Sequence, residues 1–291
     1  MKVITFSTQK EKHIGVLQND IIISLTVLNP SKFPPCLKTF IEGSDNLRNH
    51  AEQLLEQRDN ENAVFTLSDV KILPSISQPE KIICVGLNYI DHCKETGMEP
   101  PASPVIFSKY SNAIIGHNDA VEIPINSNEV DFEAELVVVI GKKAKYVSVE
   151  EANNHVFGYT IMNDISARDL QFTDGQWSRG KTADTFAPIG PIVVTQDEVG
   201  DPHQLSISLE LNGEIMQDSN TSNLIFTVPQ IISFLSQSMT LKPGDLIATG
   251  TPPGVGMGRN PKVWLKSGDE MNIKIEKIGT LTNFVQNRHA N

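Results

Sequence analysis

Hydrophobic and polar residues alternate along many segments of this chain, a period typical of strands rather than helices. The clearest segment is LSISLELNGEIMQ, in which leucine or isoleucine recurs at every second position from Leu205 to Leu211, directly before Asn212 and Gly213. An Asn-Gly pair readily adopts the two positive φ angles of a type I′ turn, so this segment predicts a β-hairpin. Two later segments, GDLIATG and GDEMNIKIEKIG, each predict a strand that begins after a Gly-Asp turn.

Residues 1–73 predict a small α+β unit. The segment KVITFSTQKEKHIGVLQNDIIISL has the pattern of two or three short strands, and apolar residues at helical spacing then run from Leu37 to Leu54. The segment LPSISQPEK follows, with serines between Pro74 and Pro79, and this composition indicates a boundary between two domains.

Few helices are predicted in the second domain, residues 80–291, and those few are short. Ser148 with Glu151 forms a capping box for VEEANNHV, and Thr227 with Gln230 forms another for PQIISFLSQS. The predicted fold class is therefore α+β and mainly β, with a larger domain covered by a few short helices and preceded by the small N-terminal domain.

Charge and cysteine content argue against several classes of function. The net charge of -11 and the pI near 5.1 disfavour nucleic acid and anionic membranes as partners, because the phosphates of both would be repelled. Three cysteines without a CxxC pair predict neither a disulfide framework nor a zinc site, and they favour a reducing compartment.

No targeting signal stands out in the chain. No apolar run approaches the roughly 20 residues that cross a bilayer, and the first residues resemble neither a signal peptide nor an Arg-rich transit sequence. We expect a soluble cytoplasmic protein. A mitochondrial location stays open if this start omits a leader or if import uses no cleavable one.

The segment VDFEAELVVVIG, residues 130–141, combines acidic residues with a fully apolar run. Glu133 and Glu135 are two positions apart, so on a strand both side chains leave the same face and can converge on one cation. Carboxylate oxygens favour Mg²⁺, Mn²⁺ or Ca²⁺. A solvated strand face explains the same spacing, but Asp164, at the end of the apolar strand in FGYTIMNDISARDLQ, offers the third oxygen that a metal site needs.

The residues after Asp164 predict a polar helix face. Asp164, Arg168 and Gln171 recur at i, i+4 and i+7, so on a helix that begins at the acid they would point the same way. The alternative is an ordinary surface pair between Asp164 and Arg168 that stabilises the helix by only about 0.3 to 0.5 kcal/mol.

A possible acid/base pair lies in ICVGLNYIDHCKETG. A buried strand ends at Gly86, and a short helix then places His92 and Glu95 at i and i+3, within reach of a hydrogen bond. A carboxylate that orients a neutral imidazole is a workable general acid/base pair near neutral pH, although such pairs also occur for structural reasons.

Two glycine-rich motifs resemble nucleotide-binding loops without their context. GQWSRGKT, from Gly175 to Thr182, fits the pattern GxxxxGK[ST], but polar DLQFTD precedes it and the prolines of ADTFAPIGP follow it, so the required strand and helix are missing. GTPPGVGMG also lacks a following helix. We interpret its glycines as shaping a loop where the backbone approaches a ligand closely.

Taken in order, the segments GLNYIDHCKE, VDFEAEL, MNDISARDLQ and GKTADTFAPIGP, followed by TGTPPGVG, resemble the fumarylacetoacetate hydrolase family. The resemblance covers roughly residues 80 to 285, and NYIDHCKE, DPHQL and TGTPPGVG are most similar to the domain-containing protein 2 group of that family. It implies a mixed β-roll or β-sandwich catalytic domain, a homodimer, and one divalent metal, most simply Mg²⁺, that acts on small 2-oxo or β-diketo acids.

The resemblance also implies roles for individual residues. Carried over by motif, the metal ligands would be Glu133, Glu135 and Asp164. His92 and Glu95 would be the acid/base pair, and Lys181 would act as the electrophilic residue. The residues that contact the substrate would be Arg168, Gln171, Lys109 and Thr251. Two positions depart from the family pattern. Val85 stands where fumarylacetoacetate hydrolases proper have a fourth metal carboxylate, and Ala183 stands where related members often have a bulkier residue.

The implied function is oxaloacetate keto–enol tautomerisation. Hydrolysis of a C–C bond in acylpyruvate-type or fumarylacetoacetate-type acids would use the same residues, and decarboxylation of oxaloacetate is a further alternative. A family member that binds metal and ligand without turnover is a different class of hypothesis, and the presence of His92, Glu95 and Lys181 argues against it.

Overall fold

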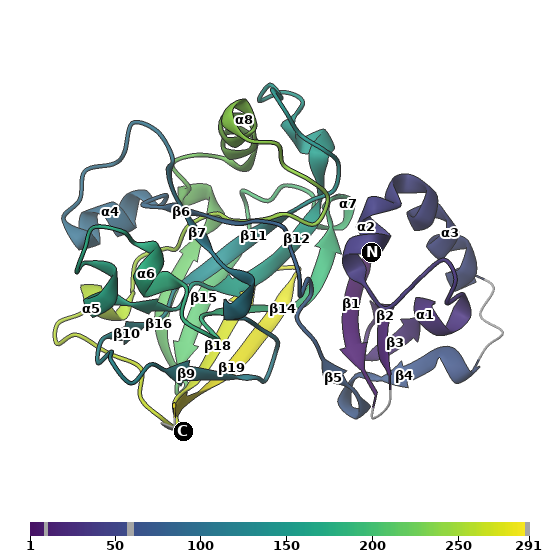
Figure 1. Cartoon of the computed structure of the whole chain (residues 1–291), viewed down its shortest axis with the longest axis horizontal. Coiled ribbons are helices and arrows are strands. Elements are labelled where there is room, and N and C mark those ends of the chain that lie inside the picture. Colours follow the sequence, from purple (N-terminus) through teal and green to yellow (C-terminus); the bar gives the residue numbers. More distant parts are fainter. Residues whose placement is uncertain (9–10, 57–60, 289–291) are drawn as a thin grey trace.

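The computed structural model describes residues 1–8, 11–56 and 61–288, and Figure 1 shows two lobes of unequal size. The smaller lobe holds the beginning of the chain and is formed by β1 (Lys2–Ser7), β2 (Lys12–Gln18), β3 (Ile21–Ser24), α1 (Leu25–Leu28), α2 (Leu37–Glu42), α3 (Ser44–Glu56), β4 (Val64–Thr66) and β5 (Lys71–Ile72). The predicted helical stretch from Leu37 to Leu54 is therefore two helices, which meet at Gly43.

The larger lobe contains the rest of the described chain. Its strands are β6 (Ile82–Gly86), β7 (Val105–Lys109), β8 (Ile114–Ile115), β9 (Ala120–Ile123), β10 (Val130–Asp131), β11 (Ala134–Ile140), β12 (Val156–Asn163), β13 (Ser166–Ala167), β14 (Ala187–Thr195), β15 (Ser206–Leu211), β16 (Glu214–Asn220), β17 (Leu246–Ala248), β18 (Glu270–Ile275) and β19 (Gly279–Asn287). Its α-helices are α4 (Ile90–Thr96), α5 (Arg168–Gln171), α6 (Ser178–Lys181), α7 (Gln196–Val199) and α8 (Val228–Ser238). Short 3-10 helices at Glu61–Ala63, Leu67–Asp69, Ser111–Ala113, Ala152–His155, Thr221–Asn223 and Gly256–Gly258 complete the described elements of both lobes.

One large mixed sheet runs through both lobes. Its strand order is β4-β3-β2-β1-β14-β12-β11-β17-β6-β7, with β5 paired to β1 and β8 paired to β14. The lobes join where Lys2 and Val3 of β1 pair antiparallel with Val194 and Val193 of β14. The division into domains 1–73 and 80–291 stays a prediction.

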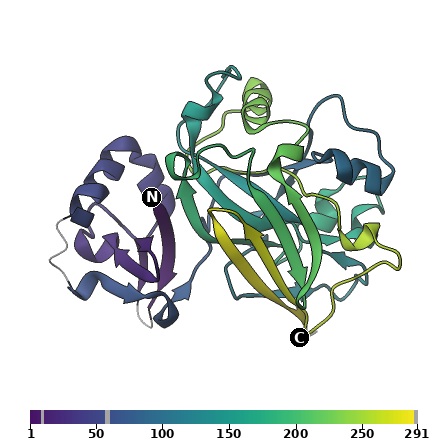
Figure 2. The same cartoon turned by 180° about the vertical axis from the view of Figure 1, so that it is seen from behind.

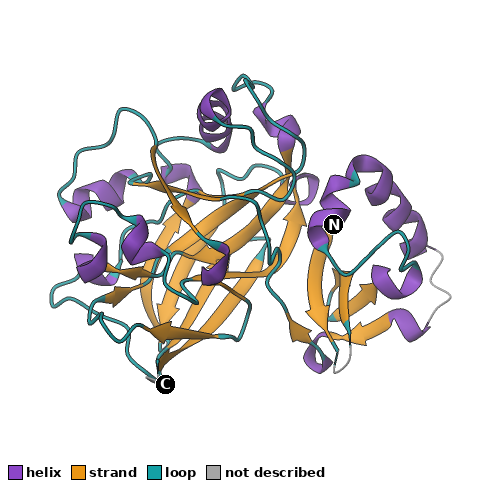
Figure 3. Cartoon of the chain, in the orientation of Figure 1, coloured by secondary structure: helices purple, strands orange, loops and turns teal. Residues whose placement is uncertain are grey.

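The core lies between this sheet and a second sheet of order β16-β15-β18-β19-β9, of which the yellow strands β18 and β19 lie in front of the large sheet in Figure 2. Every residue of β11 is buried, whereas buried and more exposed positions alternate along β15 and β18. Each aliphatic side chain that is fully buried in this way contributes about 1.5 to 3 kcal/mol. The predicted fold class, α+β and mainly β, is confirmed (Figure 3).

The predicted local signals have mixed outcomes. Asn212 and Gly213 have φ angles of 54° and 81° between β15 and β16, so the hairpin is confirmed. Thr227 and Gln230 form the predicted capping box of α8. Ser148 Oγ accepts a hydrogen bond from Glu151 N at 3.3 Å, but only a short 3-10 helix follows. No described helix is long and apolar enough to cross a membrane.

Candidate metal and catalytic site

The acidic segment changes sheets in its middle. Val130 and Asp131 form β10, which pairs with β13, whereas β11 begins at Ala134 and pairs with β12. Between them, Glu133 N donates to Asn163 Oδ1 at 2.9 Å and Asp164 N donates to Glu133 O at 2.9 Å. These two bonds hold the start of β11 against the end of β12.

This arrangement gathers three carboxylates inside the protein. Oxygens of Glu133, Glu135 and Asp164 all lie within 4.8 Å of one another, and the three residues are at most 5% exposed. The solvated-face explanation for Glu133 and Glu135 is therefore wrong, because both side chains are buried. Several buried carboxylates are costly unless positive charge compensates them.

Two lysines supply part of that charge. Lys181 Nζ donates to Glu133 Oε2 at 2.7 Å and to Asp164 Oδ2 at 2.9 Å, and Lys109 Nζ donates to Asp164 Oδ1 at 2.5 Å and to Ile165 O at 3.0 Å. Both lysines are 2% exposed. Burial alone would raise the pKa of Glu133, but Lys181 and Arg168 lower it to about 2.

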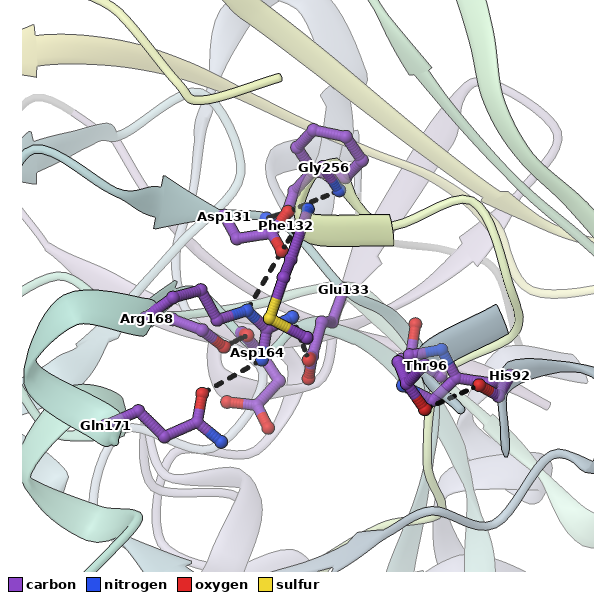
Figure 4. Close-up of polar contacts among 12 residues, drawn as sticks. His92, Thr96, Asp131, Phe132, Glu133, Asp164, Arg168, Gln171 and Gly256 are labelled. Atoms are coloured by element: carbon purple, nitrogen blue, oxygen red, sulfur yellow. Dashed lines mark hydrogen bonds and ion pairs between the residues drawn. The ribbon is translucent and has the colours of Figure 1, made fainter. Parts of the chain in front are cut away.

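Arg168 supplies the third buried positive charge, and Figure 4 shows its contact with Gln171. Its Nε donates to Asp131 Oδ2 at 2.9 Å, its Nη2 to Glu133 Oε1 at 2.6 Å and its Nη1 to Gln171 Oε1 at 3.0 Å. Asp131 therefore supports the site by holding Arg168. Asp131 also accepts hydrogen bonds from the backbone nitrogens of Gly256 at 2.7 Å and Met257 at 3.1 Å.

The predicted helix face with Asp164, Arg168 and Gln171 is only partly correct. Helix α5 begins at Arg168, and Asp164 lies before it, between β12 and the short strand β13. Because the chain is extended through β13, Arg168 contacts Asp131 and Glu133 instead of Asp164. The alternative of a surface pair is also wrong, since Arg168 is only 4% exposed.

The buried charges of this cluster do not balance, and a bound cation would compensate the excess negative charge. Four buried carboxylates face three buried cations: Asp131, Glu133, Glu135 and Asp164 against Lys109, Arg168 and Lys181. Burial first, and then Asp164 and Glu133, raise the pKa of Glu135 well above its usual range. Glu135 Oε2 has one backbone donor, Gly250 N at 2.9 Å. Three converging carboxylates with an uncompensated negative charge fit a divalent metal ion, which prefers such oxygen ligands.

The predicted acid/base pair is formed on α4. His92 Nδ1 lies 3.1 Å from Glu95 Oε2, and Glu95 Oε1 accepts a hydrogen bond from Gly254 N at 2.8 Å. Glu95 is thus fixed at both oxygens, and the ring of His92 is oriented through Nδ1. Helix α4 ends at Gly97, whose φ of 67° suits a residue without a side chain.

One pocket brings most of these side chains together. It has an empty volume of about 460 Å³, open solvent at its mouth included. Of the predicted site residues, those that line it are His92, Glu133, Glu135, Arg168, Gln171, Lys181 and Thr251. Glu95, Lys109 and Asp164 are not part of this lining: Glu95 contacts His92, and Lys109 contacts Asp164 and Ile165 O. Lys109 supports Asp164 in this arrangement, and its predicted contact with a substrate stays a prediction.

Apolar residues that the sequence reasoning did not assign form another part of the pocket wall. Phe107 and Trp177 pack edge to face with their ring centroids 5.7 Å apart, and Val85, Met98, Phe172 and Met257 also line the cavity. No spacing or motif marks such residues as pocket residues, because apolar side chains in strands and loops are usually core.

Both glycine-rich motifs contact carboxylates of the site. Lys181 ends the four-residue helix α6, which follows α5 rather than a strand, and its amine contacts the carboxylates. In GTPPGVGMG, the backbone nitrogens of Gly250, Gly254 and Gly256 donate to Glu135, Glu95 and Asp131. The sequence predicted a close backbone approach here, but not that carboxylates of the protein itself receive it.

Residues 81–286 match the family described as Fumarylacetoacetate (FAA) hydrolase C-terminal. This chain belongs to the fumarylacetoacetate hydrolase family. An oxaloacetate tautomerase of Rattus norvegicus, described as mitochondrial, is 42% identical over 291 residues, which cover 98% of this chain and 91% of the relative. A fumarylacetoacetate hydrolase domain-containing protein 2 homolog of Dictyostelium discoideum is 43% identical over 301 residues, which cover 98% of this chain and 97% of the relative.

Solved structures of fumarylacetoacetate hydrolase family proteins share the fold. A fumarylacetoacetate hydrolase from Exiguobacterium antarcticum matches with a TM-score of 0.86 and 36% identity, covering 99% of this chain and 100% of that one. A maleylpyruvate hydrolase from Sphingobium sp. SYK-6, in complex with manganese(II) and pyruvate, matches with a TM-score of 0.82 and 32% identity at the same coverage. The expected family, fold and enzyme character are thereby confirmed, and the acidic triad fits the divalent metal expected for it.

Proposed function

We propose that this protein is a Mg²⁺-dependent oxaloacetate keto–enol tautomerase. The observation that carries the proposal is that three elements meet at one pocket: Glu133 and Glu135 of the buried carboxylate triad, the Lys181 ammonium, and His92 of the His92–Glu95 pair. The relatives named as oxaloacetate tautomerases, at 42% to 44% identity, support this reaction over others of the family.

Glu133, Glu135 and Asp164 would hold the metal, with Mn²⁺ or Ca²⁺ as alternatives to Mg²⁺. When bound, the cation supplies positive charge for the enolate oxygen that develops during tautomerisation. Lys181 adds a second positive charge from the protein itself. Arg168 and Gln171 line the same pocket and are fixed to each other at 3.0 Å, which suits them to orient a carboxylate of the substrate.

His92 would move the proton. Glu95 occupies Nδ1, so Nε2 is the nitrogen free to take a proton from C3 of oxaloacetate, and the protonated ring then returns that proton to the C2 oxygen. The keto and enol forms differ only in the position of this proton, so no other reactant is needed. Glu95 holds the ring and stabilises its protonated state, and Gly254 N holds Glu95.

Hydrolysis of an acylpyruvate-type C–C bond is the second candidate. The apolar wall formed by Val85, Phe107 and Trp177 favours it, because an uncharged acyl group fits such a wall better than a second carboxylate does. In that reaction His92 would activate a water for attack on the distal carbonyl. Val85 offers no carboxylate as a further metal ligand, which separates this chain from fumarylacetoacetate hydrolases proper.

A spectrophotometric comparison tests the proposal. Purified protein with Mg²⁺ is given enol-oxaloacetate, an acylpyruvate and fumarylacetoacetate in parallel, and CO₂ release from oxaloacetate is followed separately. We expect the enol absorbance of oxaloacetate to decay fastest relative to the uncatalysed rate, without CO₂ release. Faster cleavage of the acylpyruvate would replace the tautomerase proposal with the hydrolase, and CO₂ release would replace it with the decarboxylase.

The family resemblance also supports a homodimer, for which light scattering would give a mass of twice 32.1 kDa. The mitochondrial relatives favour mitochondria over the cytoplasm as the compartment.

A further inference from the structure

Gln217 on β16 connects the acidic strand with the glycine-rich loop. Its Oε1 accepts a hydrogen bond from Ala134 N at 2.9 Å, and its Nε2 donates to Thr251 Oγ1 at 2.8 Å and to Pro252 O at 2.7 Å. The residue is 0% exposed. Because Ala134 stands between Glu133 and Glu135, a single side chain contacts both the metal-ligand strand and a residue that lines the pocket.

The orientation of this amide is fixed by two partners with invariable roles. Ala134 N–H can only donate and the Pro252 carbonyl can only accept, so the oxygen of Gln217 must face Ala134 and its nitrogen must face Pro252. The NH₂ group has a second hydrogen, which points to Thr251 Oγ1. Thr251 is therefore the acceptor in that bond.

A hydroxyl that accepts one hydrogen bond still has its own proton to donate. Thr251 lines the pocket beside His92, Glu135 and Lys181, and within the described ranges no protein acceptor is found for its hydroxyl proton. The proton is thus available to an oxygen atom of a bound ligand. A carboxylate or carbonyl oxygen would accept it, whereas an ammonium group would not.

We propose that Gln217 is a positioning residue that sets the Thr251 hydroxyl as a hydrogen-bond donor to the substrate. The inference rests on the proposed function, which places a small 2-oxo acid in this pocket. Gln217 does not touch the substrate and acts through Thr251. Its bond to Ala134 N fixes the position of the Thr251 hydroxyl relative to the segment that carries Glu133 and Glu135.

Four variants test the proposal: Thr251→Val, Thr251→Ser, Gln217→Glu and the double variant Gln217→Glu with Thr251→Val. KM and kcat are measured with oxaloacetate and Mg²⁺, and the Kd of pyruvate is measured by calorimetry. Thr251→Val should raise KM and Kd about tenfold, as expected for loss of one hydrogen bond to a charged group, and Thr251→Ser should leave both nearly unchanged.

Gln217→Glu should also raise KM about tenfold, because a carboxylate oxygen in place of Nε2 accepts the Thr251 proton and turns it away from the substrate. In the Thr251→Val background the same change should add nothing, since both act through one hydroxyl. Should Gln217→Glu not fold, Gln217→Met replaces it. This variant removes the donor that orients the Thr251 hydroxyl but adds no carboxylate that would turn the hydroxyl away from the substrate. KM should therefore rise less, about threefold.

Asn283 provides a matched control, because its buried amide also donates two hydrogen bonds, in this case to the backbone carbonyls of Gly116 at 2.8 Å and Asp119 at 2.9 Å. Asn283→Leu should lower Tm while KM stays at the wild-type value. If the KM effects of the two single variants instead multiply to about a hundredfold in the double variant, Gln217 does not act through Thr251. This result would overturn the positioning role of Gln217 and leave the proposed function intact. Wild-type protein that neither binds pyruvate nor converts oxaloacetate would overturn the proposed function and this donor assignment together.

Discussion

Asp131 and Arg168 form a buried ion pair of 2.9 Å in which the acid accepts the Nε hydrogen and the guanidinium keeps its two other nitrogens for Glu133 and Gln171. Asp131 is not a metal ligand candidate, yet it fixes the arginine that contacts one. It does so from β10, a strand outside the sheet that carries Glu135.

Asp131→Asn should therefore lower both stability and activity. One carboxylate oxygen becomes an NH₂ group that faces hydrogen-bond donors, and Arg168 loses a buried partner, a loss that typically costs 3 to 5 kcal/mol. Substitution of a residue that supports metal ligands in this way typically lowers metal affinity or activity about 10- to 100-fold. Thermal unfolding and calorimetric titration with Mg²⁺ measure both effects. Wild-type affinity for Mg²⁺ in a folded Asp131→Asn protein would contradict this role.

Metal removal should destabilise the protein and abolish turnover. The four buried carboxylates exceed the three buried cations around them by one negative charge, and Mg²⁺ at 100 times its Kd should stabilise the folded state by about 2.7 kcal/mol. EDTA should lower Tm accordingly, and Glu133→Ala with Glu135→Ala should remove the response to Mg²⁺. Glu214→Ala, at an exposed position of the hairpin, serves as the control and should keep that response. Full turnover in EDTA would exclude a metal mechanism.

His92→Ala should separate metal binding from catalysis. His92 lines the pocket but is not part of the triad, so calorimetry should give the wild-type Kd for Mg²⁺. Loss of a general acid/base should lower kcat about 10²- to 10⁴-fold. An unchanged kcat would remove His92 from the proposed mechanism.

Gly254→Ala should impair the acid/base pair through the backbone. Gly254 has a φ of 105°, and an added Cβ would collide with the carbonyl oxygen of Met216, so the nitrogen that holds Glu95 must move. Gly213, with a φ of 81° and open space around it, is the matched control. Both variants should lose about 1 to 2 kcal/mol from the positive φ angle, but only Gly254→Ala should lose kcat. Equal kcat values in the two variants would show that the bond to Glu95 is dispensable.

The contact between Arg48 on α3 and Asp197 on α7 should make a pH-dependent contribution to stability. Burial would raise the pKa of Asp197, but the 2.8 Å bond from Arg48 lowers it to about 2. Because the folded-state pKa is lowered, the stabilisation is present above the ordinary pKa of about 3.9 and disappears as the pH falls through about 2.

Arg48→Met tests this contact by chemical denaturation. The pair is partly exposed, so the variant should lose at most about 1 kcal/mol at pH 7, and the difference from wild type should shrink toward zero below pH 4. A difference that is constant from pH 7 to pH 2 would assign the loss to packing instead of the ion pair.

Elements that depend on local chemistry could be predicted from the sequence. The Asn212-Gly213 hairpin and the capping box of α8 rest on contacts within a few residues, and both are formed. The extent of a regular element was harder to predict. Neither the break at Gly43 nor the start of α5 at Arg168 follows from spacing alone, because the packing of the surrounding chain decides where each element ends.

The site shows the same division between local and distant contacts. The i, i+2 spacing of Glu133 and Glu135 allowed a metal site, but their burial depends on strands that lie far away in the sequence. Likewise, the structure pairs Arg168 with Asp131, 37 residues earlier, rather than with nearby Asp164. Gln217, 83 residues after Ala134, carries no motif at all, and only the fold brings the two together.

The pairing of β1 with β14 determines how the chain can be shortened. β14 hydrogen-bonds with β12 on one side and with β1 on the other, so deletion of residues 1–73 would leave the backbone around Val193 and Val194 as an open edge strand. Apolar edges of this kind recruit strands from other molecules and promote aggregation. The family match begins at residue 81, but a fragment cut there would lack the strand that closes its sheet.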